Sequence, residues 1–425
     1  MNTDFLITES YKRLWGDPEL ERRIDEGISR HRKSDGVIRI TDAGGRPLPG
    51  TRVEVRQLDS AFHFGANIFM LGGYPTDELN RKYEEAFCGL FNGATVPFYW
   101  RGLEPEQGRP RYSADSAPFA RRPPPDVVIA FCESRGIRMH GHYLVWDFIK
   151  WSIPEWLPAD PAASEPIWEN RVREIGGRYG RRIGRWDVVN EAVAGTWRPS
   201  GGFPMPEDYE RKAFAWAEKY FPADARLDIN ETVDAWEKDL DAYCGLVTRL
   251  LDDKARIGGV GLQFHLFADE DMRRVLAGEL YPPGKLLDAL DRCGALDRPI
   301  HISEITLTSP GNSDEGLRAQ AEVARNYYRL WFSHRAVDGI TWWNVPDGGA
   351  APGEDNVFSG LLHDDLSPKP AYHALKDLLH REWRTEASGA TGEDGCFRFR
   401  GFHGKYLVKT ESGAESSIVL PQNIE

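Results

Sequence analysis

The chain has 425 residues and a formal net charge of −13, and 41% of its residues are hydrophobic. This composition is typical of a globular protein with ample core-forming material, and the length suits one large domain with an appendage. The negative charge excludes a nucleic-acid partner, because no basic surplus is available to neutralise phosphates, and no apolar run is long enough to span a membrane.

The amino terminus, MNTDFLITESYKRLWGD, has no basic segment followed by an apolar run, so no signal peptide is visible. We therefore expect a cytoplasmic protein; a chain whose leader had been removed would look the same and would be secreted or periplasmic. The sequence contains no CxxC pair, so we expect neither a zinc ribbon nor a disulfide framework. The five cysteines are scattered, at Cys88, Cys132, Cys244, Cys293 and Cys396. We expect no cofactor, and the oligomeric state stays open.

Both ends of the chain predict parts of one small β domain. Residues 1–59 contain a charged, helix-compatible segment (9–33) and two alternating strands, 37–40 and 53–55, around a Gly/Pro turn. Residues 384–425 show the same alternating pattern, with Phe397 and Phe399 before a Gly-containing turn and Tyr406 and Val408 after it. Because an isolated hairpin is not stable by itself, we expect the two hairpins to assemble into one β-sandwich.

Residues 60–383, between these ends, alternate short β-rich runs with longer segments that can hold helices. The candidate strands are 62–69, 93–100, 137–146, 185–193, 226–230, 257–266, 299–307 and 338–345. Eight β/α units predict an α/β protein with a closed (β/α)8 TIM barrel rather than an open sheet. In such a barrel, polar residues at the C-terminal ends of the strands usually carry the chemistry.

Two carboxylates occupy such positions. Glu191 ends the fourth strand in WDVVNEAV (186–193), and Glu304 ends the seventh in PIHISEITL (299–307). Two carboxyl groups facing each other across a cavity are the minimal equipment for glycoside hydrolysis, one protonated and one ionised, and repulsion and unequal burial would separate their pKa values. The alternative is that each is a structural carboxylate paired with an arginine such as Arg185 or Arg298.

The motifs VVNEA, GHYLVW, GLQFHL, HISEI and LLHDDLSPKPAYHAL (361–375) resemble, in the same order, those of glycoside hydrolase family 10, the endo-1,4-β-xylanases and their relatives. The resemblance covers about residues 60–380. It implies a retaining mechanism through a covalent glycosyl-enzyme, with Glu191 as acid/base, Glu304 as nucleophile and Asn190 on the sugar 2-hydroxyl. It also implies sugar contacts from His142, Trp146, Gln263, His265 and Trp343, although either tryptophan could instead be a core residue and His265 a core imidazole.

The chain departs from the family pattern around these residues. Val96 and Tyr99 precede Trp100 where the family usually has Asn and Lys, and Asp147 stands where it has His. Further along the chain, INET (229–232) replaces Asn-Asp-Tyr, and Ile305 and Thr306 replace Leu-Asp after the second glutamate. We include Tyr99, Trp100 and Asp147 among the sugar-binding candidates and expect the Asp147 carboxylate to repel uronic-acid decorations. We therefore expect poor activity on polymeric xylan and better activity on short β-linked oligosaccharides or small glycosides.

Two other functions stay open. His140 and His142 form an HxH pair on one strand face, with His265 and His301 elsewhere, as in metal-dependent barrel hydrolases. That class places HxH on its first strand, so we predict no metal. A carbohydrate-binding pseudoenzyme, in which the altered site still holds sugar without turnover, is the other alternative.

Overall fold

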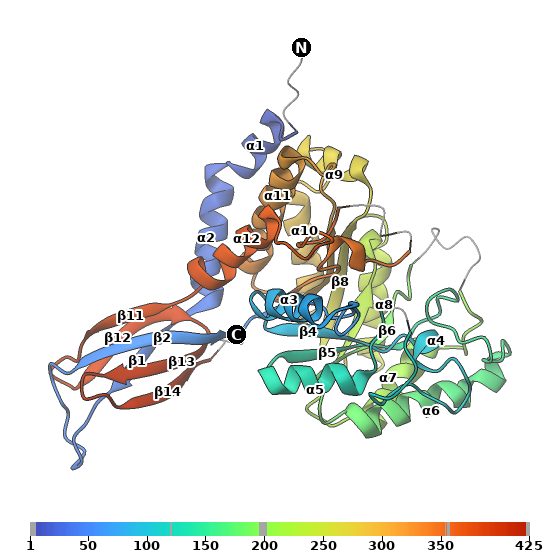
Figure 1. The fold of residues 1–425 in the computed structure, drawn as a ribbon, viewed down its shortest axis with the longest axis horizontal. Helices are drawn as coiled ribbons and strands as arrows, with labels where there is room; N and C mark the ends of the chain where they lie inside the picture. The colour runs from blue at the N-terminus through green and yellow to red at the C-terminus, as the bar shows by residue number, and fades with distance from the viewer. Residues whose placement is uncertain (1–5, 120, 195–201, 353, 355–357, 422–425) are drawn as a thin grey trace.

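The structure is a computed structural model that describes residues 6–119, 121–194, 202–352, 354 and 358–421. Within these residues, parallel strands close a barrel in the order β10, β3, β4, β5, β6, β7, β8, β9 (Figure 1). The strands are β3 (His63–Asn67), β4 (Gly93–Pro97), β5 (Arg138–Val145), β6 (Arg185–Asn190), β7 (Arg226–Glu231), β8 (Gly259–Leu266), β9 (Ile300–Leu307) and β10 (Val337–Trp342). Each falls in or within one residue of a predicted strand segment, so the predicted TIM barrel is confirmed.

Helices surround these strands (Figure 1). They are α3 (Asp77–Cys88), α4 (Trp100–Leu103), α5 (Pro125–Arg135), α6 (Pro161–Tyr179), α7 (Tyr209–Tyr220), α8 (Leu240–Asp252), α9 (Asp269–Leu276), α10 (Pro283–Gly294), α11 (Asp314–Ser333) and α12 (Pro370–Asp377), with short turns η1 (Val233–Trp236), η2 (Asp347–Gly349) and η3 (Leu378–Glu382). In the part of the chain described here, no helix has the length and apolar character needed to cross a bilayer.

The barrel strands are apolar on both faces because one face fills the barrel interior and the other contacts the helices. Strands β3, β4 and β9 are buried along their whole length. Side-chain caps define several of the helix starts. Ser313 accepts a hydrogen bond from the Gly316 N–H at the start of α11, and Asp160 accepts one from Ala163 at the start of α6.

The N-terminal helices α1 (Glu9–Trp15) and α2 (Pro18–Arg32) pack on α11 of the barrel. The Trp15 ring lies 5.3 Å from the Tyr327 ring, and Asn326 Nδ2 donates to the Tyr11 hydroxyl at 3.1 Å. Tyr11 and Trp15 are buried, as expected for anchors. These helices therefore extend the barrel core, although the sequence analysis grouped them with the β domain.

A β-sandwich built from both chain ends lies to one side of the barrel (Figure 1). One sheet pairs β1 (Lys33–Arg39) with β12 (Cys396–Phe402); the other has the order β11 (Glu386–Ala390), β2 (Arg52–Ser60), β13 (Gly404–Thr410), β14 (Glu415–Leu420). The sandwich is confirmed, but the two predicted hairpins are wrong, because β1 and β2 lie in different sheets, as do β12 and β13. Their apolar sides face one another across the sandwich core of Ile38, Val53, Val55, Phe397, Tyr406, Val408 and Leu420.

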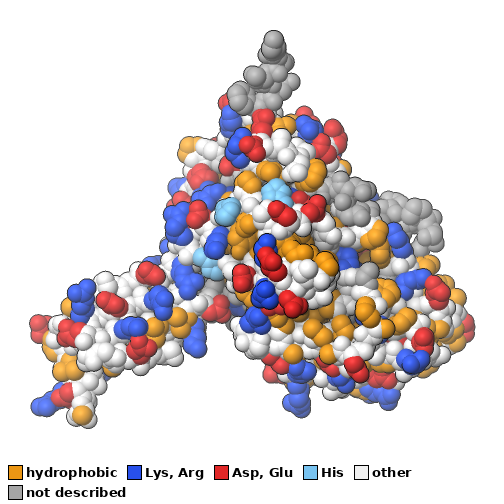
Figure 2. All heavy atoms as spheres, viewed as in Figure 1, with side chains coloured by type: hydrophobic (Ala, Val, Ile, Leu, Met, Phe, Trp, Pro, Cys, Tyr) orange, Lys and Arg blue, Asp and Glu red, His pale blue; other side chains and the backbone are white. Residues whose placement is uncertain are grey.

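Charged side chains of both signs are interspersed on the face seen in Figure 2, over the barrel and the sandwich alike. The net charge of −13 is therefore not gathered into one acidic patch on this face.

Candidate active site

A cavity of about 450 Å³ opens at the C-terminal ends of the barrel strands. Aromatic side chains form a cluster at this mouth, and four of its buried members are Phe69, Tyr99, Trp146 and Trp343. Flat apolar rings of this kind suit the faces of a sugar. The cavity is lined by nine of the residues predicted from the sequence: Tyr99, His142, Trp146, Asn190, Glu191, Gln263, His265, Glu304 and Trp343.

Glu191 follows the last residue of β6 and has a φ of 54°, in the left-handed region. Residues other than glycine adopt this conformation mainly where the surroundings enforce it, often at functional sites. The Glu191 N–H donates to the Asn230 carbonyl at 2.8 Å. The carboxyl accepts hydrogen bonds from Gln263 Nε2 at 3.0 Å and Trp146 Nε1 at 3.1 Å. These neutral donors orient the carboxyl group toward the cavity.

Glu304 enters the same cavity from β9 and is 4% exposed. Asn230 Nδ2 donates to its Oε1 at 3.0 Å, and His142 Nε2 and His265 Nε2 lie 3.8 and 3.4 Å from its two oxygens. Burial raises the pKa of Glu304 to about 8; the charge of His142 opposes this rise, and the charge of Glu191 adds to it. The two carboxyl groups thus lie in one cavity with different hydrogen-bond partners.

His265 contacts Glu304 as an uncharged group at neutral pH, because burial lowers the pKa of its imidazole to about 4. Its Nδ1 lies 2.9 Å from the Thr306 hydroxyl. Thr306, one of the departures from the family pattern, therefore orients the ring that faces the nucleophile candidate.

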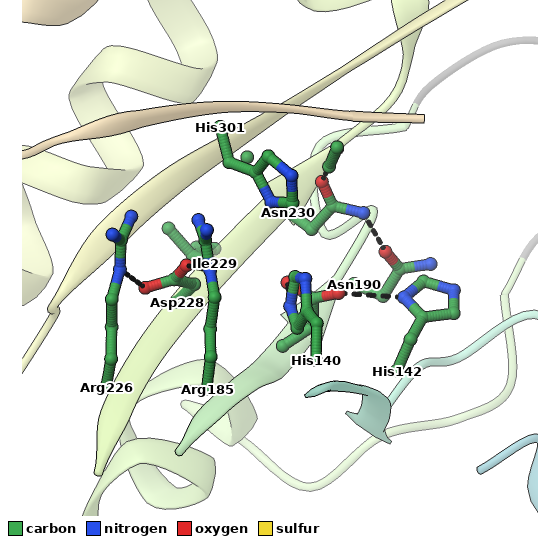
Figure 3. Close-up of polar contacts among 12 residues, drawn as sticks. His140, His142, Arg185, Asn190, Arg226, Asp228, Ile229, Asn230 and His301 are labelled. Carbon is green, nitrogen blue, oxygen red and sulfur yellow. Dashed lines mark hydrogen bonds and ion pairs between the residues drawn. The ribbon is translucent and has the colours of Figure 1, made fainter. Parts of the chain in front are cut away.

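A second layer of polar side chains supports the cavity from inside the barrel (Figure 3). Asp187 accepts a hydrogen bond from His142 Nδ1 at 2.8 Å and has His140 Nε2 3.0 Å away. Burial alone would raise the pKa of Asp187, but His140 and His142 hold it below its ordinary value. Asn230 donates to Asn190 Oδ1 at 2.8 Å. Asp187 is a site residue that was not among the candidates predicted from the sequence, although it is a carboxylate in the same apolar run as Glu191.

Trp100 does not line the cavity, so its assignment to the sugar site is corrected. It is fully buried at the start of α4, where its ring lies 4.4 Å from the Trp168 ring and its Nε1 donates to Glu104 at 2.8 Å. A short helix begins at this residue and turns the side chain away from the strand end. Val96, before it on β4, is also fully buried.

Asp147 is the second predicted site residue outside the cavity lining. Its carboxylate is directed at the chain near Gly202, where an added Cβ would collide with Asp147 Oδ2. The chain turns after Trp146, so the next side chain leaves the cavity. The expectation that Asp147 repels uronic acids therefore loses its structural basis.

Arg185 and Arg298 have partners other than the two glutamates of the cavity. Arg185 pairs with Asp228 at 2.6 Å, and Arg298 donates to the Ile257 and Asp297 carbonyls, so neither arginine neutralises Glu191 or Glu304. His140 and His142 both face Asp187. Across the described ranges, no group of three or more His, Cys, Asp or Glu side chains is arranged to hold a metal ion.

Loop residues complete the cavity, and none of them was among the site residues predicted from the sequence. They include Arg121, Arg122, Phe148, Trp151, Thr232, Lys238 and Glu354. Strand-end patterns cannot reveal such residues, because the loops that carry them have no periodicity.

A family model for glycosyl hydrolase family 10 matches residues 100–378, more than half of the chain. The chain is 29% identical over 91% of its length to anti-sigma-I factor RsgI6 of Acetivibrio thermocellus, of which it spans 46%. It is 26% identical over 89% of its length to endo-1,4-beta-xylanase 2 of Arabidopsis thaliana, of which it spans 32%. It is also 28% identical over 71% of its length to endo-1,4-beta-xylanase B of Thermotoga neapolitana, of which it spans 84%.

Solved structures share the fold. Xylanase 10B from Thermotoga petrophila RKU-1, in complex with xylobiose, superimposes with a TM-score of 0.62 at 23% identity, covering 76% of this chain and 95% of that one. The barrel, the order of its motifs and the extent of the family match agree, and the chain belongs to glycosyl hydrolase family 10.

Proposed function

We propose that the chain is a retaining glycoside hydrolase that acts on short β-linked xylose-type oligosaccharides. The observation that carries the proposal is the pair of carboxyl groups, Glu191 after β6 and Glu304 on β9, in one cavity with aromatic walls. Two carboxyl groups flanking a glycosidic bond can cleave it by double displacement. The names of the two xylanase relatives support the xylose-type substrate.

In the first step, the Glu304 carboxylate attacks the anomeric carbon while Glu191 gives its proton to the departing glycosidic oxygen. A covalent glycosyl-enzyme forms and the leaving group departs as an alcohol. Glu191, now ionised, takes a proton from water, and the resulting hydroxide displaces Glu304 and restores both groups. Asn190, whose Oδ1 accepts from Asn230, donates from its Nδ2 to the sugar 2-hydroxyl during both steps.

Glu304 must be ionised when it attacks, whereas its buried surroundings favour the protonated form. Burial and the charge of Glu191 raise the pKa of Glu304 to about 8 against the opposing effects of His142 and Asn230, so the group must lose its proton before it attacks. Positive charge develops at the anomeric carbon in the transition state and favours the carboxylate. Asp187 holds His142 beside Glu304, so the imidazole is positioned to stabilise that negative charge.

The mechanism is tested with Glu191→Ala and added azide. This variant should lose activity most on substrates with poor leaving groups, because they need protonation, and azide should restore turnover by reacting with the glycosyl-enzyme. Nuclear magnetic resonance of the glycosyl azide should show the same anomeric configuration as the substrate. An inverted azide would exclude double displacement. Glu304→Ala serves as the control, in which azide should not restore turnover to a glycosyl azide of retained configuration.

The substrate length is tested by comparing polymeric xylan with xylo-oligosaccharides and a panel of aryl β-glycosides. Tyr99 stands in place of an amide or lysine at the distal part of the site and can offer only a neutral hydroxyl, so we expect binding there to be weaker by about 10- to 100-fold. Specific activity should be higher on the short substrates. Rapid random cleavage of xylan into a ladder of oligomers would contradict the proposal.

A second candidate function keeps support from one relative. The chain resembles, over 91% of its own length, a protein named as an anti-sigma-I factor, a name that states no enzymatic activity. The alternatives are a carbohydrate-binding barrel without turnover, on the same aromatic cavity, and a hydrolase of a different short β-glycoside. Turnover of any aryl β-glycoside that is lost in Glu304→Ala excludes the non-catalytic alternative. Binding of xylo-oligosaccharides without turnover by the unmodified protein would support it.

A further inference from the structure

Two adjacent arginines, Arg121 and Arg122, line the cavity at one end, from the loop between α4 and α5. The guanidinium carbon of Arg122 lies 3.9 Å from the centre of the Tyr99 ring and 4.6 Å from that of Phe69. The guanidinium carbon of Arg121 lies 5.7 Å from the centre of the Phe69 ring, and the group donates to Asn344 Oδ1 at 2.8 Å. Both side chains are thus built into the aromatic wall of the site.

Neither arginine forms an ion pair with an acidic side chain in the described part of the chain, although the charge of Glu354 acts on both. Among the described residues, no carboxylate oxygen lies within 4.0 Å of either guanidinium group. Glu354 also lines this end, but its carboxylate accepts a hydrogen bond from Asn344 Nδ2 at 3.2 Å. Arg121 Nε is buried and has no hydrogen-bond partner within the residues that the structure describes.

The loop holds Arg121 in place at some conformational cost. Arg121 has a φ of 42°, in the left-handed region that a side chain disfavours. Arg111 fixes the loop by donating hydrogen bonds to the Gly102 carbonyl at 2.8 Å and the Ala117 carbonyl at 2.6 Å. Burial lowers the pKa of Arg121 to about 10; the charge of Arg122 adds to this lowering and that of Glu354 opposes it, so the group stays charged at neutral pH.

The arginines lie on the side of the cavity that faces the sugar attached to the nucleophile. Phe69, Tyr99 and Asn344 follow β3, β4 and β10, which continue around the barrel from β9, the strand of Glu304. Glu191, which protonates the leaving group, follows β6 and is separated from this arc by β5. Tyr99 lies between the arginines and the reacting centre, 5.5 Å from the His142 ring.

We propose that Arg121 and Arg122 form a subsite for an anionic group on the part of the substrate that stays with Glu304, so that the enzyme prefers acidic saccharides over neutral ones. A uronic-acid carboxylate fits the planar guanidinium fork by two parallel hydrogen bonds. A sulfate ester on the sugar offers the same charge and acceptors. This inference rests on the proposed hydrolase function and specifies its substrate class, and it reverses the expectation drawn from Asp147.

Three aryl substrates test the subsite: 4-nitrophenyl β-xylobioside, the same compound with glucuronic acid on its terminal xylose, and the same compound with a sulfate ester there. We expect kcat/KM of the unmodified enzyme to be about 10- to 100-fold higher for an anionic substrate than for the neutral one, the range of one charge-assisted contact. The ratio should approach one in Arg121→Gln and be partly retained in Arg121→Lys. The carboxylate and sulfate arms distinguish the two anion types.

Arg109→Gln is the matched control, because it removes the same charge from the same loop. Arg109 is exposed, pairs with Glu106 at 2.7 Å and does not line the cavity, so the ratio should not change. Equal kcat/KM for neutral and anionic substrates in the unmodified enzyme, or an equal fall of the ratio in Arg109→Gln, would overturn the subsite.

Calorimetry with Glu304→Gln separates this inference from the proposed function. The variant should bind glucuronic-acid-bearing xylobiose more tightly than xylobiose, with a preference that added salt weakens. If no substrate is turned over but the binding preference is present, the hydrolase proposal fails and the anionic subsite stands. If turnover occurs without any preference, the subsite fails and the hydrolase proposal stands.

Discussion

Glu304 is a carboxyl group that the fold buries at a cost in stability. Its strand places it among buried neighbours at the barrel mouth, and the hydrogen bond from Asn230 and the charge of His142 only partly offset the loss of water. A carboxyl group with a raised pKa is easier to bury protonated than ionised. The buried environment of Glu304 therefore destabilises the folded protein when the group loses its proton.

This cost predicts a pH-dependent gain in stability for Glu304→Gln. The pKa is about 8 when folded and close to the ordinary value of 4.5 when unfolded, so below pH 4.5 both states are protonated and the group costs nothing. Between pH 4.5 and 8 the unfolded state loses the proton first, and the penalty grows toward about 5 kcal/mol above pH 8. Denaturant unfolding of both proteins from pH 5 to 9 should show a difference that increases in favour of the variant. A difference that stays constant over this range would contradict the raised pKa.

At the scale of elements, strands β6 and β7 carry a continuous set of polar groups through the barrel interior. At the N-terminal end, Arg185 and Arg226 both pair with Asp228, at 2.6 and 2.8 Å (Figure 3). At the C-terminal end, the same two strands supply Asn190 and Asn230. Buried charges of this kind are stable only when each has a partner, so the arginine–aspartate cluster is the structural end of the barrel. At the amide end, Asn230 holds Asn190 and Glu304, and Asn190 lines the cavity.

The elements also show what a sequence can and cannot predict. The eight strand segments were identifiable because buried parallel strands are short apolar runs, and Glu191 and Glu304 stood out as charges at their ends. The partners of β1 and β2 were not identifiable, because alternation shows which face of a strand is buried but not which strand lies beside it. The side-chain directions of Trp100 and Asp147 depend on the turns that follow β4 and β5, and those turns leave no pattern in the sequence.

At the scale of the whole molecule, helix α2 connects the barrel to the β-sandwich without a linker. Arg32, its last residue, donates to the carbonyls of Phe332, His334 and Val337 in the barrel, and β1 begins at the next residue. Phe402, at the end of β12, packs 6.2 Å from the Phe332 ring. The sandwich is thus fixed to the end of α11, away from the strand ends that form the cavity.

Deletion of residues 386–425 should therefore lower stability and solubility more than activity. It removes β11 to β14 and exposes Ile38, Val53 and Val55, which are 6%, 0% and 2% exposed in the intact protein. Buried aliphatic side chains that lose their cover promote aggregation, whereas no residue that lines the cavity is removed. Thermal unfolding and an aryl-glycoside assay of the soluble fraction measure the two effects.

Two single substitutions on β1 make the test independent of the deletion. Ile38→Ala removes a core side chain and should destabilise the sandwich by roughly 2–5 kcal/mol. Val37→Ala alters its neighbour, which is 58% exposed, and should stay within about 0.5 kcal/mol of the unmodified protein. If Ile38→Ala and the deletion both leave the melting curve unchanged, the two chain ends do not form a common core. If Val37→Ala destabilises as much as Ile38→Ala, the face of β1 that carries Val37, and not the face that carries Ile38, is turned toward β2 and β13.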